Sequence, residues 1–294
     1  MKNPKPGCRF VVFADVHYVV PPHPRLSWPQ LVEKLPEQPR VTELIDTMLP
    51  MALEQVHAEL RPDFIVYAGD QVNVGWDEEG LANQHGFRNL LAEASSASFP
   101  QSRGSGFQPD SDEVPVYLVY GNHDRPRERY LEFYGETIYS FTCNGCHFAV
   151  LDSGVMHPED DYDPPEIFTT GLDELQNMLD RAAGAPAAVL LHFYIYPTDI
   201  VGYSYPAAAE AIAMIESYSR PVPVLNGHLH DGRVDIANGQ LYFTARSFIE
   251  SPFCFYLHEL SEDSLQIDEY MLDFNTGRWS RYRMCAFDLS PASA

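Results

Sequence analysis

The sequence predicts an α/β protein, and two observations lead to this prediction. Short buried strands alternate with helical segments from residue 9 to residue 225, and most of the remaining chain reads as strands without helices. Five of the buried strands also end directly in polar side chains. Open α/β sheets bind their ligands just beyond the carboxyl ends of the strands. We therefore expect a sheet-based fold whose functional site lies where these five strands end.

The five strands are short runs of β-branched, aromatic and other apolar residues, as is typical of buried strands. In chain order they are residues 9–14 before Asp15-Val16-His17, residues 64–68 before Gly69-Asp70, residues 116–120 before Gly121-Asn122-His123-Asp124, residues 187–191 before His192, and residues 222–225 before Asn226-Gly227-His228-Leu229-His230. An amide, an imidazole and a carboxylate crowded at the tip of a core strand would pack poorly. These endings therefore indicate chemistry.

Segments with apolar side chains at helical spacing separate the strands. They are residues 41–60, 86–94, 127–133, 172–183 and 207–219. Pro50 lies inside the first segment and predicts a kink or a break there. Gly184 follows the fourth segment, as is typical of a helix C-terminus.

The remaining strands are predicted from a turn signal and from composition. Residues 137–143 and 146–151 alternate on either side of Asn144-Gly145, which is a strong hairpin signal. Residues 233–287 read as four or five strands, which we expect to form a mostly antiparallel sheet. No linker or internal repeat divides the chain. Residues 1–294 are therefore predicted to form a single domain.

Four segments without clear periodicity are predicted to be loops near the strand ends, where specificity is set in this kind of fold. They are residues 18–40, residues 71–112 apart from the predicted helix at 86–94, residues 152–170 and residues 193–206. The last of them carries Tyr194, Tyr196, Tyr203 and Tyr205. These tyrosines could be ordinary packing residues, or they could line a pocket and stack on a ring of the substrate.

The side chains at the strand ends are of types that bind metal ions. Oxygen and imidazole ligands without thiolates suit Mn, Fe, Zn or Co, and they do not suit a structural zinc site built on cysteine. Eight such side chains are too many for one ion, but they suit two ions about 3.5–4 Å apart that share a bridging carboxylate. Glycine precedes three of the five blocks, where we expect the backbone to turn tightly.

The ordered series Asp-x-His, Gly-Asp, Gly-Asn-His-Asp, His and Gly-His-x-His resembles the calcineurin-like metallophosphoesterase superfamily over residues 9–245. It is most similar to the branch with cyclic-nucleotide phosphodiesterases and purple-acid-phosphatase-like enzymes. The resemblance implies a four-layer α/β/β/α sandwich, with two mixed sheets packed face to face and helices outside. It also implies a cofactor of two divalent or mixed-valence metal ions.

The resemblance further implies a role for each polar residue at the strand ends. Asp15, His17 and His230 look like ligands of the first metal, Asp70 looks like the bridging carboxylate, and Asn122, His192 and His228 look like ligands of the second metal. His123 matches the histidine that binds a phosphate oxygen or protonates the leaving group, with a metal-bridging hydroxide as the nucleophile. Asp124 is expected either to orient His123 or to cap the following turn.

These assignments predict metal-dependent hydrolysis of a phosphoester, and we favour a phosphodiester. The substrate is expected to be a small molecule, with a nucleotide as one candidate. Two positions differ from the pattern of the family. Relatives that cleave cyclic nucleotides commonly have a second histidine where this chain has Phe193, and many relatives have Asp where it has Asn73. A phosphomonoesterase or nucleotidase is the alternative enzyme. A non-catalytic scaffold that keeps its metals is the alternative of another class.

Charge and composition exclude other classes. The formal net charge of −23 argues against a basic nucleic-acid surface, because phosphate neutralisation needs clustered Lys and Arg. No run approaches the roughly 18 apolar residues of a membrane span. The N-terminal residues lead into a strand that carries ligands, so we expect no signal peptide.

Three further features concern cysteine and arginine. The five cysteines are odd in number and irregularly spaced, which predicts reduced thiols in a cytoplasmic protein. Cys143 and Cys146 have the spacing of a redox motif or of half a zinc site. They flank the predicted hairpin turn and have no partner pair, so ordinary packing is the default interpretation. Arg246 is a candidate for contact with a substrate anion.

Overall fold

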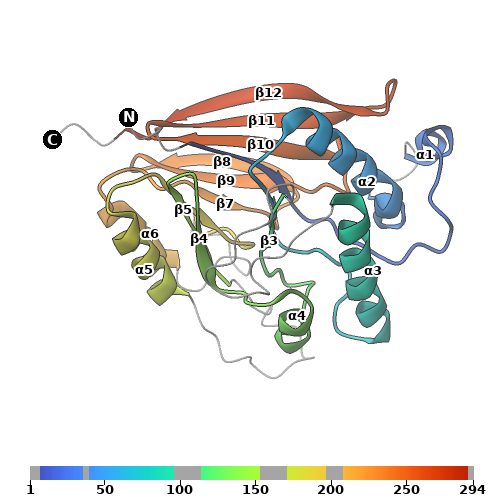
Figure 1. Cartoon of the computed structure of the whole chain (residues 1–294), viewed down its shortest axis with the longest axis horizontal. Helices are drawn as coiled ribbons and strands as arrows, with labels where there is room; N and C mark the ends of the chain where they lie inside the picture. The colour runs from blue at the N-terminus through green and yellow to red at the C-terminus, as the bar shows by residue number, and fades with distance from the viewer. Residues whose placement is uncertain (1–6, 36–39, 96–113, 153–170, 197–207, 291–294) are drawn as a thin grey trace.

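The computed structural model describes residues 7–35, 40–95, 114–152, 171–196 and 208–290. These residues form two six-stranded sheets with helices packed on the outer face of each sheet (Figure 1). The α/β class that the sequence predicts and the four-layer α/β/β/α sandwich that the resemblance implies are both confirmed.

The first sheet joins the beginning of the described chain to its end. Its strands, in order across the sheet, are β12 (Arg278–Asp288), β11 (Ser264–Asp273), β10 (Cys254–Ser261), β1 (Gly7–Phe13), β2 (Phe64–Tyr67) and β3 (Val116–Leu118). β1, β2 and β3 run parallel to one another, whereas β10, β11 and β12 pair antiparallel with their neighbours. The parallel strands therefore end at the same edge of this sheet.

The second sheet is built mainly from the middle of the chain. Its strands, in order, are β4 (Tyr139–Cys143), β5 (Cys146–Val150), β6 (Ala187–Leu190), β7 (Val224–Asn226), β9 (Gln240–Arg246) and β8 (Asp231–Ala237). β5, β6, β7 and β9 are parallel, and antiparallel strands close both edges. Both sheets are thus mixed, as expected.

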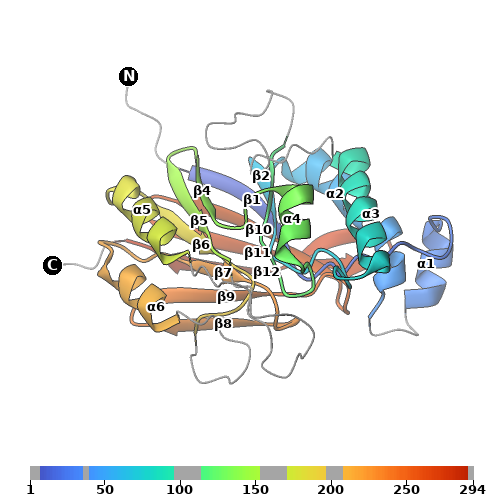
Figure 2. The ribbon, with the colours of Figure 1, turned by 90° about the horizontal axis from the view of Figure 1, so that it is seen from below.

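Three hydrophobic cores separate the four layers. Helices α1 (Trp28–Lys34), α2 (Ile45–Gln55), α3 (Glu78–Ser95) and α4 (Arg127–Tyr134) contribute to a core with the first sheet, and helices α5 (Leu172–Ala182) and α6 (Ala208–Ser217) to a core with the second. Figure 2 shows these two helix groups on opposite sides of the sheets. The third core lies between the sheets. None of the helices in the described ranges has the length and hydrophobicity needed to cross a membrane.

The prediction for the last strands needs a correction. Five strands follow residue 230, but they do not form one mostly antiparallel sheet. β8 and β9 complete the second sheet, with β9 parallel to β7, while β10, β11 and β12 complete the first. Strand propensity shows which residues are extended but not which partner they take, because the partner is set by long-range packing. The pairing of β10 with β1 supports the proposal that the chain is a single domain.

The helices also differ in places from the prediction. Pro50 lies inside α2, which continues without a break to Gln55, and a π-helical turn then runs to Leu60. α3 begins at Glu78, eight residues before the predicted start at Gly86. The acidic residues of its first turn favour a helix N-terminus but do not add to an apolar pattern.

Helix α1 falls within residues 18–40, which were predicted to be a loop. Its start is specified locally, because the Ser27 N–H donates to the Gln30 side chain at 2.9 Å and Pro29 occupies the first turn. Leu31 is buried against the outer core. A helix of only seven residues is too short to produce a clear apolar period.

The predicted hairpin of β4 and β5 is confirmed. Asn144 and Gly145 both have positive φ, at 48° and 80°, as a two-residue type I′ turn requires. Parts of the predicted loops, namely residues 36–39, 96–112, 153–170 and 197–206, lie outside the described residues.

Aromatic rings hold the two sheets together. Phe10 stacks on Phe64 at 4.8 Å, and Phe148 of the second sheet meets both rings edge-on at 5.4 and 5.1 Å. His258 stacks on the other side of this cluster, 5.0 Å from Phe10, and is fully buried. Burial lowers the pKa of His258 to about 3 from its usual value of 6.5.

We expect His258 to make the fold sensitive to acid. Its pKa is lower in the folded state than in the unfolded state, so between pH 6.5 and pH 3 the unfolded chain binds a proton that the folded chain does not. The free energy of unfolding should therefore fall by up to about 1.4 kcal/mol per pH unit as the pH drops through this range. The free energy of unfolding, measured with urea at several pH values, should depend less on pH in a His258→Phe variant than in the wild type.

A control replaces an exposed histidine by the same residue. His85→Phe should keep the pH dependence of the wild type, because His85 is exposed on α3. Equal pH dependence of the wild type and His258→Phe would contradict the assignment of this effect to His258.

Candidate metal centre

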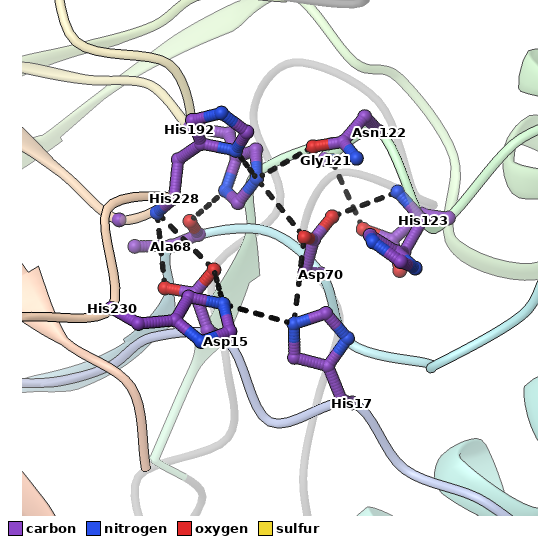
Figure 3. A network of polar contacts seen from close by, with 12 residues as sticks. Asp15, His17, Ala68, Asp70, Gly121, Asn122, His123, His192, His228 and His230 are labelled. Atoms are coloured by element: carbon purple, nitrogen blue, oxygen red, sulfur yellow. Dashed lines mark hydrogen bonds and ion pairs between the residues drawn. The ribbon is translucent and has the colours of Figure 1, made fainter. Parts of the chain in front are cut away.

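The five strand-end blocks predicted from the sequence meet at one place (Figure 3). They follow β1, β2 and β3 of the first sheet and β6 and β7 of the second, so both sheets contribute. The residues brought together are Asp15, His17, Asp70, Asn122, His123, His192, His228 and His230. Segments more than two hundred positions apart thus converge on one site.

One group of side chains contains Asp15, His17 and His230. Their ligand atoms all lie within 4.8 Å of one another. His230 Nε2 is 3.3 Å from His17 Nε2 and 3.5 Å from Asp15 Oδ1. These are the residues that the resemblance implied for the first metal.

A second group contains Asp70, His192 and His228, whose ligand atoms also lie within 4.8 Å of one another. His192 Nε2 lies 3.3 Å from His228 Nδ1 and 3.2 Å from Asn122 Oδ1. The amide oxygen of Asn122 therefore belongs to this group, as expected for the second metal.

Asp70 connects the two groups. Its Oδ2 atom is 3.6 Å from His17 Nε2 and 3.2 Å from His192 Nε2. Its Oδ1 atom accepts a hydrogen bond from the backbone N–H of His123 at 2.8 Å. The carboxylate is buried and fixed, with one oxygen facing both groups. A bridging ligand needs this arrangement.

The backbone is strained where it presents these side chains. Asp15, His17, Asp70 and His228 all have positive φ, between 45° and 72°. Such conformations are uncommon outside glycine and concentrate at functional sites, where the surrounding fold enforces them. The fold thus holds four of the eight side chains in orientations that an ordinary strand or helix would not give.

Two glycines allow the blocks to approach one another. A Cβ atom at Gly227 would lie 2.7 Å from Asp15 Oδ2 and 2.8 Å from the Ala68 carbonyl oxygen. A Cβ atom at Gly121 would overlap the backbone of Asp70. The chain turns directly after both glycines, as expected: the N–H of Asp124 donates to the carbonyl oxygen of Gly121 at 3.1 Å, and the N–H of Leu229 donates to that of Gly227 at 2.9 Å. Neither glycine has positive φ. At these two positions glycine provides space for close approach, whereas Gly69 does have positive φ, at 92°.

The donor set fits cations. His192 Nδ1 lies 2.8 Å from the carbonyl oxygen of Ala68, and because a carbonyl only accepts, Nδ1 carries the proton. In its neutral form His192 would therefore turn an unprotonated Nε2 toward the oxygens of Asp70 and Asn122, which also only accept. Lone pairs that converge in this way need a cation or a proton between them.

The pKa values of the site residues also indicate that a positive charge belongs between these side chains. Burial opposes a positive charge on His192, yet Asp70 beside it raises the pKa of His192 to about 9. Burial also opposes the charge of Asp70, but His192 holds the pKa of that carboxyl well below its usual range. Burial and the charge of His192 lower the pKa of His228 to about 3. A metal ion would compete with the proton of His192 for this position.

His123 lies beside the two groups with a defined tautomer. Its Nδ1 is 2.6 Å from the carbonyl oxygen of Asn73, so Nδ1 carries a proton and the other ring nitrogen is left for chemistry. Its ring meets the ring of His17 edge-on at 4.6 Å. Asn73 also accepts a hydrogen bond from Arg40 at 3.1 Å through its side chain. This residue thus positions His123 through its backbone.

Asp124 makes the contacts of a turn cap. Its carboxylate accepts hydrogen bonds from the backbone N–H groups of Val72, at 3.1 Å, and Gly121, at 3.0 Å. It is fully buried. The turn that Asp124 caps is the one that it ends, Gly121–Asp124, and not the following turn as expected. The Asn73 carbonyl occupies the place at His123 that Asp124 was otherwise expected to take.

Glu250 is a residue of the site that the sequence did not indicate. Its Oε1 atom lies 2.7 Å from Nδ1 of His230, an imidazole–carboxylate contact of the kind that orients metal-binding histidines. Burial opposes a charge on His230, but Asp15 and Glu250 raise its pKa to about 9. Glu250 lies 20 positions after His230, outside every motif, so only the fold could reveal it.

Trp76 and Arg125 were also missed. The ring of Trp76 lies 6.2 Å from the ring of His123 and is 42% exposed. The guanidinium of Arg125 lies over this ring, 4.5 Å from its centre. An exposed tryptophan on an irregular segment carries no periodic signal, so its place beside His123 could not be predicted from the sequence.

The aromatic loop after β6 behaves mainly as packing where it is described. Tyr194 is buried, and the ring of Tyr196 stacks on Tyr242 at 4.8 Å. Tyr203 and Tyr205 lie outside the described residues. The packing alternative therefore fits the first two tyrosines.

Two other predicted positions have clear contacts. Phe193 lies where relatives that cleave cyclic nucleotides commonly have a second histidine. Its ring packs 4.2 Å from the ring of His228. Arg246 forms an ion pair with Glu269 at 3.4 Å, so a substrate anion would have to compete with that carboxylate.

The fold and the site define a metal-dependent phosphoesterase. Residues 8–232 match the family described as calcineurin-like phosphoesterase, and the chain belongs to this family. The family uses a dinuclear metal centre.

Solved structures agree with the fold. A dimetal phosphatase from Danio rerio has a TM-score of 0.67 and 17% identity, over 97% of this chain and 100% of that chain. A structure of PhoD has a TM-score of 0.56 and 12% identity, over 100% of this chain and 73% of that chain. A comparison with curated proteins gave no match. At these identities the likeness concerns the fold alone.

We expect Glu250 to support metal binding by orienting His230. A Glu250→Gln variant should bind Mn²⁺ roughly 10–100-fold more weakly, because its amide is a poorer partner for the Nδ1–H group. Calorimetric titration of the metal-free protein with Mn²⁺ would measure the change.

The matched control is Glu259→Gln. Glu259 lies on β10 and pairs with Arg9 at the surface, at 3.3 Å. This variant should bind Mn²⁺ like the wild type. Unchanged affinity in Glu250→Gln would show that His230 needs no support from this carboxylate.

Proposed function

We propose that this phosphoesterase hydrolyses phosphodiesters at a dinuclear centre and that His123 protonates the leaving oxygen or binds a phosphate oxygen. The observation that carries the proposal is the position of Asp70, with one oxygen facing both ligand groups and the other bonded to the His123 backbone. The same carboxylate thus fixes the metal-binding groups relative to the proposed proton donor.

The proposed ligands divide as the resemblance implies. Asp15, His17 and His230 would hold one cation, Asn122, His192 and His228 the other, and Asp70 both. Two bound cations would neutralise the phosphate oxygens and lower the pKa of a water molecule that attacks phosphorus. Because the set has oxygen and imidazole donors and no thiolate, we propose Mn, Fe, Zn or Co.

His123 is suited to proton transfer. The Asn73 carbonyl accepts from Nδ1 at 2.6 Å and holds the ring in one orientation. The other nitrogen could then donate to the departing oxygen, which needs a proton because an alkoxide is a poor leaving group. Asp70 aligns the backbone of the same residue.

Asn122 contributes a neutral ligand, so the second group repels an anionic phosphoester less than a carboxylate ligand would. A diester differs from a monoester in carrying a second ester group, and the surroundings of His123 could hold that group. Arg125 and Trp76 lie beside His123 and would offer a positive charge and an apolar wall to the leaving group. A nucleotide whose phosphate is a diester is one candidate substrate, since it combines a planar base with an anionic phosphate.

A phosphomonoesterase or nucleotidase is the alternative enzyme, and a metal-bound scaffold is the alternative of another class. With Mn²⁺ added, a higher rate on p-nitrophenyl phosphate than on bis-p-nitrophenyl phosphate would favour the monoesterase. No turnover of any phosphoester in a broad panel, by protein with a full metal complement, would favour the scaffold.

We expect His123→Ala to lower kcat on phosphodiesters by about 10²–10⁴-fold, which is the usual contribution of a general acid. Its metal content should equal that of the wild type. If His123 donates a proton, the loss should be larger for a phenyl diester than for the p-nitrophenyl diester, because p-nitrophenolate leaves without help. Steady-state rates and elemental analysis of the same samples measure both quantities.

His85→Ala is the control for this substitution, since His85 is exposed on α3 and outside the site. An equal loss on both diesters would assign His123 to phosphate binding. Unchanged kcat, or loss of metal from His123→Ala, would contradict the proposed role.

A further inference from the structure

Three thiols meet at the end of the sandwich opposite the candidate metal centre. Cys8 lies near the start of β1, Cys143 ends β4 and Cys146 begins β5. The metal-binding block follows the other end of β1. A strand of this length spans roughly 20 Å. The thiols are therefore remote from the site described above, and the proposed function makes no use of them.

Two of these thiols are in direct contact. Cys8 Sγ lies 2.7 Å from Cys143 Sγ, which is closer than unbonded sulfur atoms normally approach. The backbone is also joined here, because the N–H of Gly7 donates to the carbonyl oxygen of Asn144 at 3.3 Å. The contact thus lies on a fixed junction between the first strand of one sheet and the edge hairpin of the other.

We propose that Cys8 and Cys143 form a reversible disulfide that links the two sheets. The closeness of the sulfur atoms means that only a small adjustment is needed to reach the bond length of about 2.05 Å. In the cytoplasm predicted from the sequence, thiols are kept reduced, so the link would form under oxidising conditions and be reversed by cellular reductants.

The geometry favours a disulfide over a metal ion. Cys8, Cys143 and Asp63 offer ligand atoms within 4.8 Å of one another. Two thiolates on one tetrahedral zinc ion would lie about 3.8 Å apart, given a Zn–S distance of about 2.3 Å. The observed 2.7 Å leaves no room for an ion between the sulfur atoms. The carboxylate of Asp63 already accepts the backbone N–H of Arg9 at 2.7 Å.

Cys146 is the competing partner for Cys143, because the two residues pair across the hairpin. Its sulfur, however, lies 3.8 Å from the carbonyl oxygen of Leu260 on β10 and is fully buried. Cys143 is half-buried, whereas Cys8 is only 3% exposed. Cys143 is therefore the thiol that an external oxidant reaches first, and Cys8 is the thiol placed to complete the bond.

The oxidant in this proposal is a small-molecule disulfide. The Cys143 thiolate attacks one sulfur of that disulfide and releases one small thiol, which leaves a mixed disulfide on Cys143. The Cys8 thiol then loses its proton to solvent, attacks the Cys143 sulfur and releases the second small thiol. Two protein thiols are oxidised to one disulfide, and one small disulfide is reduced to two thiols.

The link would close a long loop. Cys8 and Cys143 are 135 positions apart, so a bond between them restricts the unfolded chain strongly. The folded state already holds the two sulfur atoms together. Oxidation should therefore raise the thermal stability of the protein by roughly 4–10 °C in Tm.

The test uses the full-length wild-type protein, equilibrated with oxidised glutathione or with reduced dithiothreitol. Free thiols are then alkylated, and the protein is digested without reduction and analysed by mass spectrometry. We expect a peptide pair joined through Cys8 and Cys143 in the oxidised sample, a Tm raised by the amount above, and loss of both signals after reduction.

Matched variants identify the thiols. Cys143→Ser should abolish both the joined peptides and the rise in Tm, whereas Cys285→Ser should keep them, because Cys285 is a half-buried thiol on β12. A dominant Cys143–Cys146 link, or no link under conditions that oxidise a free dithiol standard, would overturn the proposal. So would a Cys8–Cys143 link that leaves the Tm unchanged.

Discussion

The carboxylate of Asp70 is the constraint on which the site depends. It is buried at the end of β2, the strand between β1 and β3, and its Oδ2 atom faces imidazoles that arrive from both sheets. His17 follows a strand of the first sheet and His192 a strand of the second. The two sheets must therefore pack in one relative position for both contacts to exist. The aromatic core of Phe10, Phe64 and Phe148 holds them there.

The arrangement is costly without a cation. Asp15 and Asp70 are buried carboxylates, and positive φ at Asp15, His17, Asp70 and His228 adds strain of about 1–3 kcal/mol at each residue, less where Asp or His tolerates it. A fold keeps such features where they serve function. Bound cations would offset the burial of charge and the backbone strain. They would neutralise the carboxylates and bind the side chains in the orientations that the strained backbone gives them.

The sequence predicted the α/β class and the convergence of the blocks because both have local signals, and the resemblance carried by the blocks implied the four layers. A buried strand followed at once by Asp15 or by His192 is visible in a few residues, and the order of the blocks adds specificity. Glu250 and Trp76 have no such signal, since their importance comes from contacts with His230 and His123 that only the folded chain creates. The sheet to which β8 and β9 belong was missed for the same reason, because strand pairing depends on distant partners.

The most direct test of this account is anomalous X-ray scattering from crystals of the protein grown with Mn²⁺. The account predicts two manganese peaks about 3.5–4 Å apart, with Asp70 between them and the Asp15 and His192 groups on opposite sides. A single peak, or two peaks of which only one contacts Asp70, would contradict it.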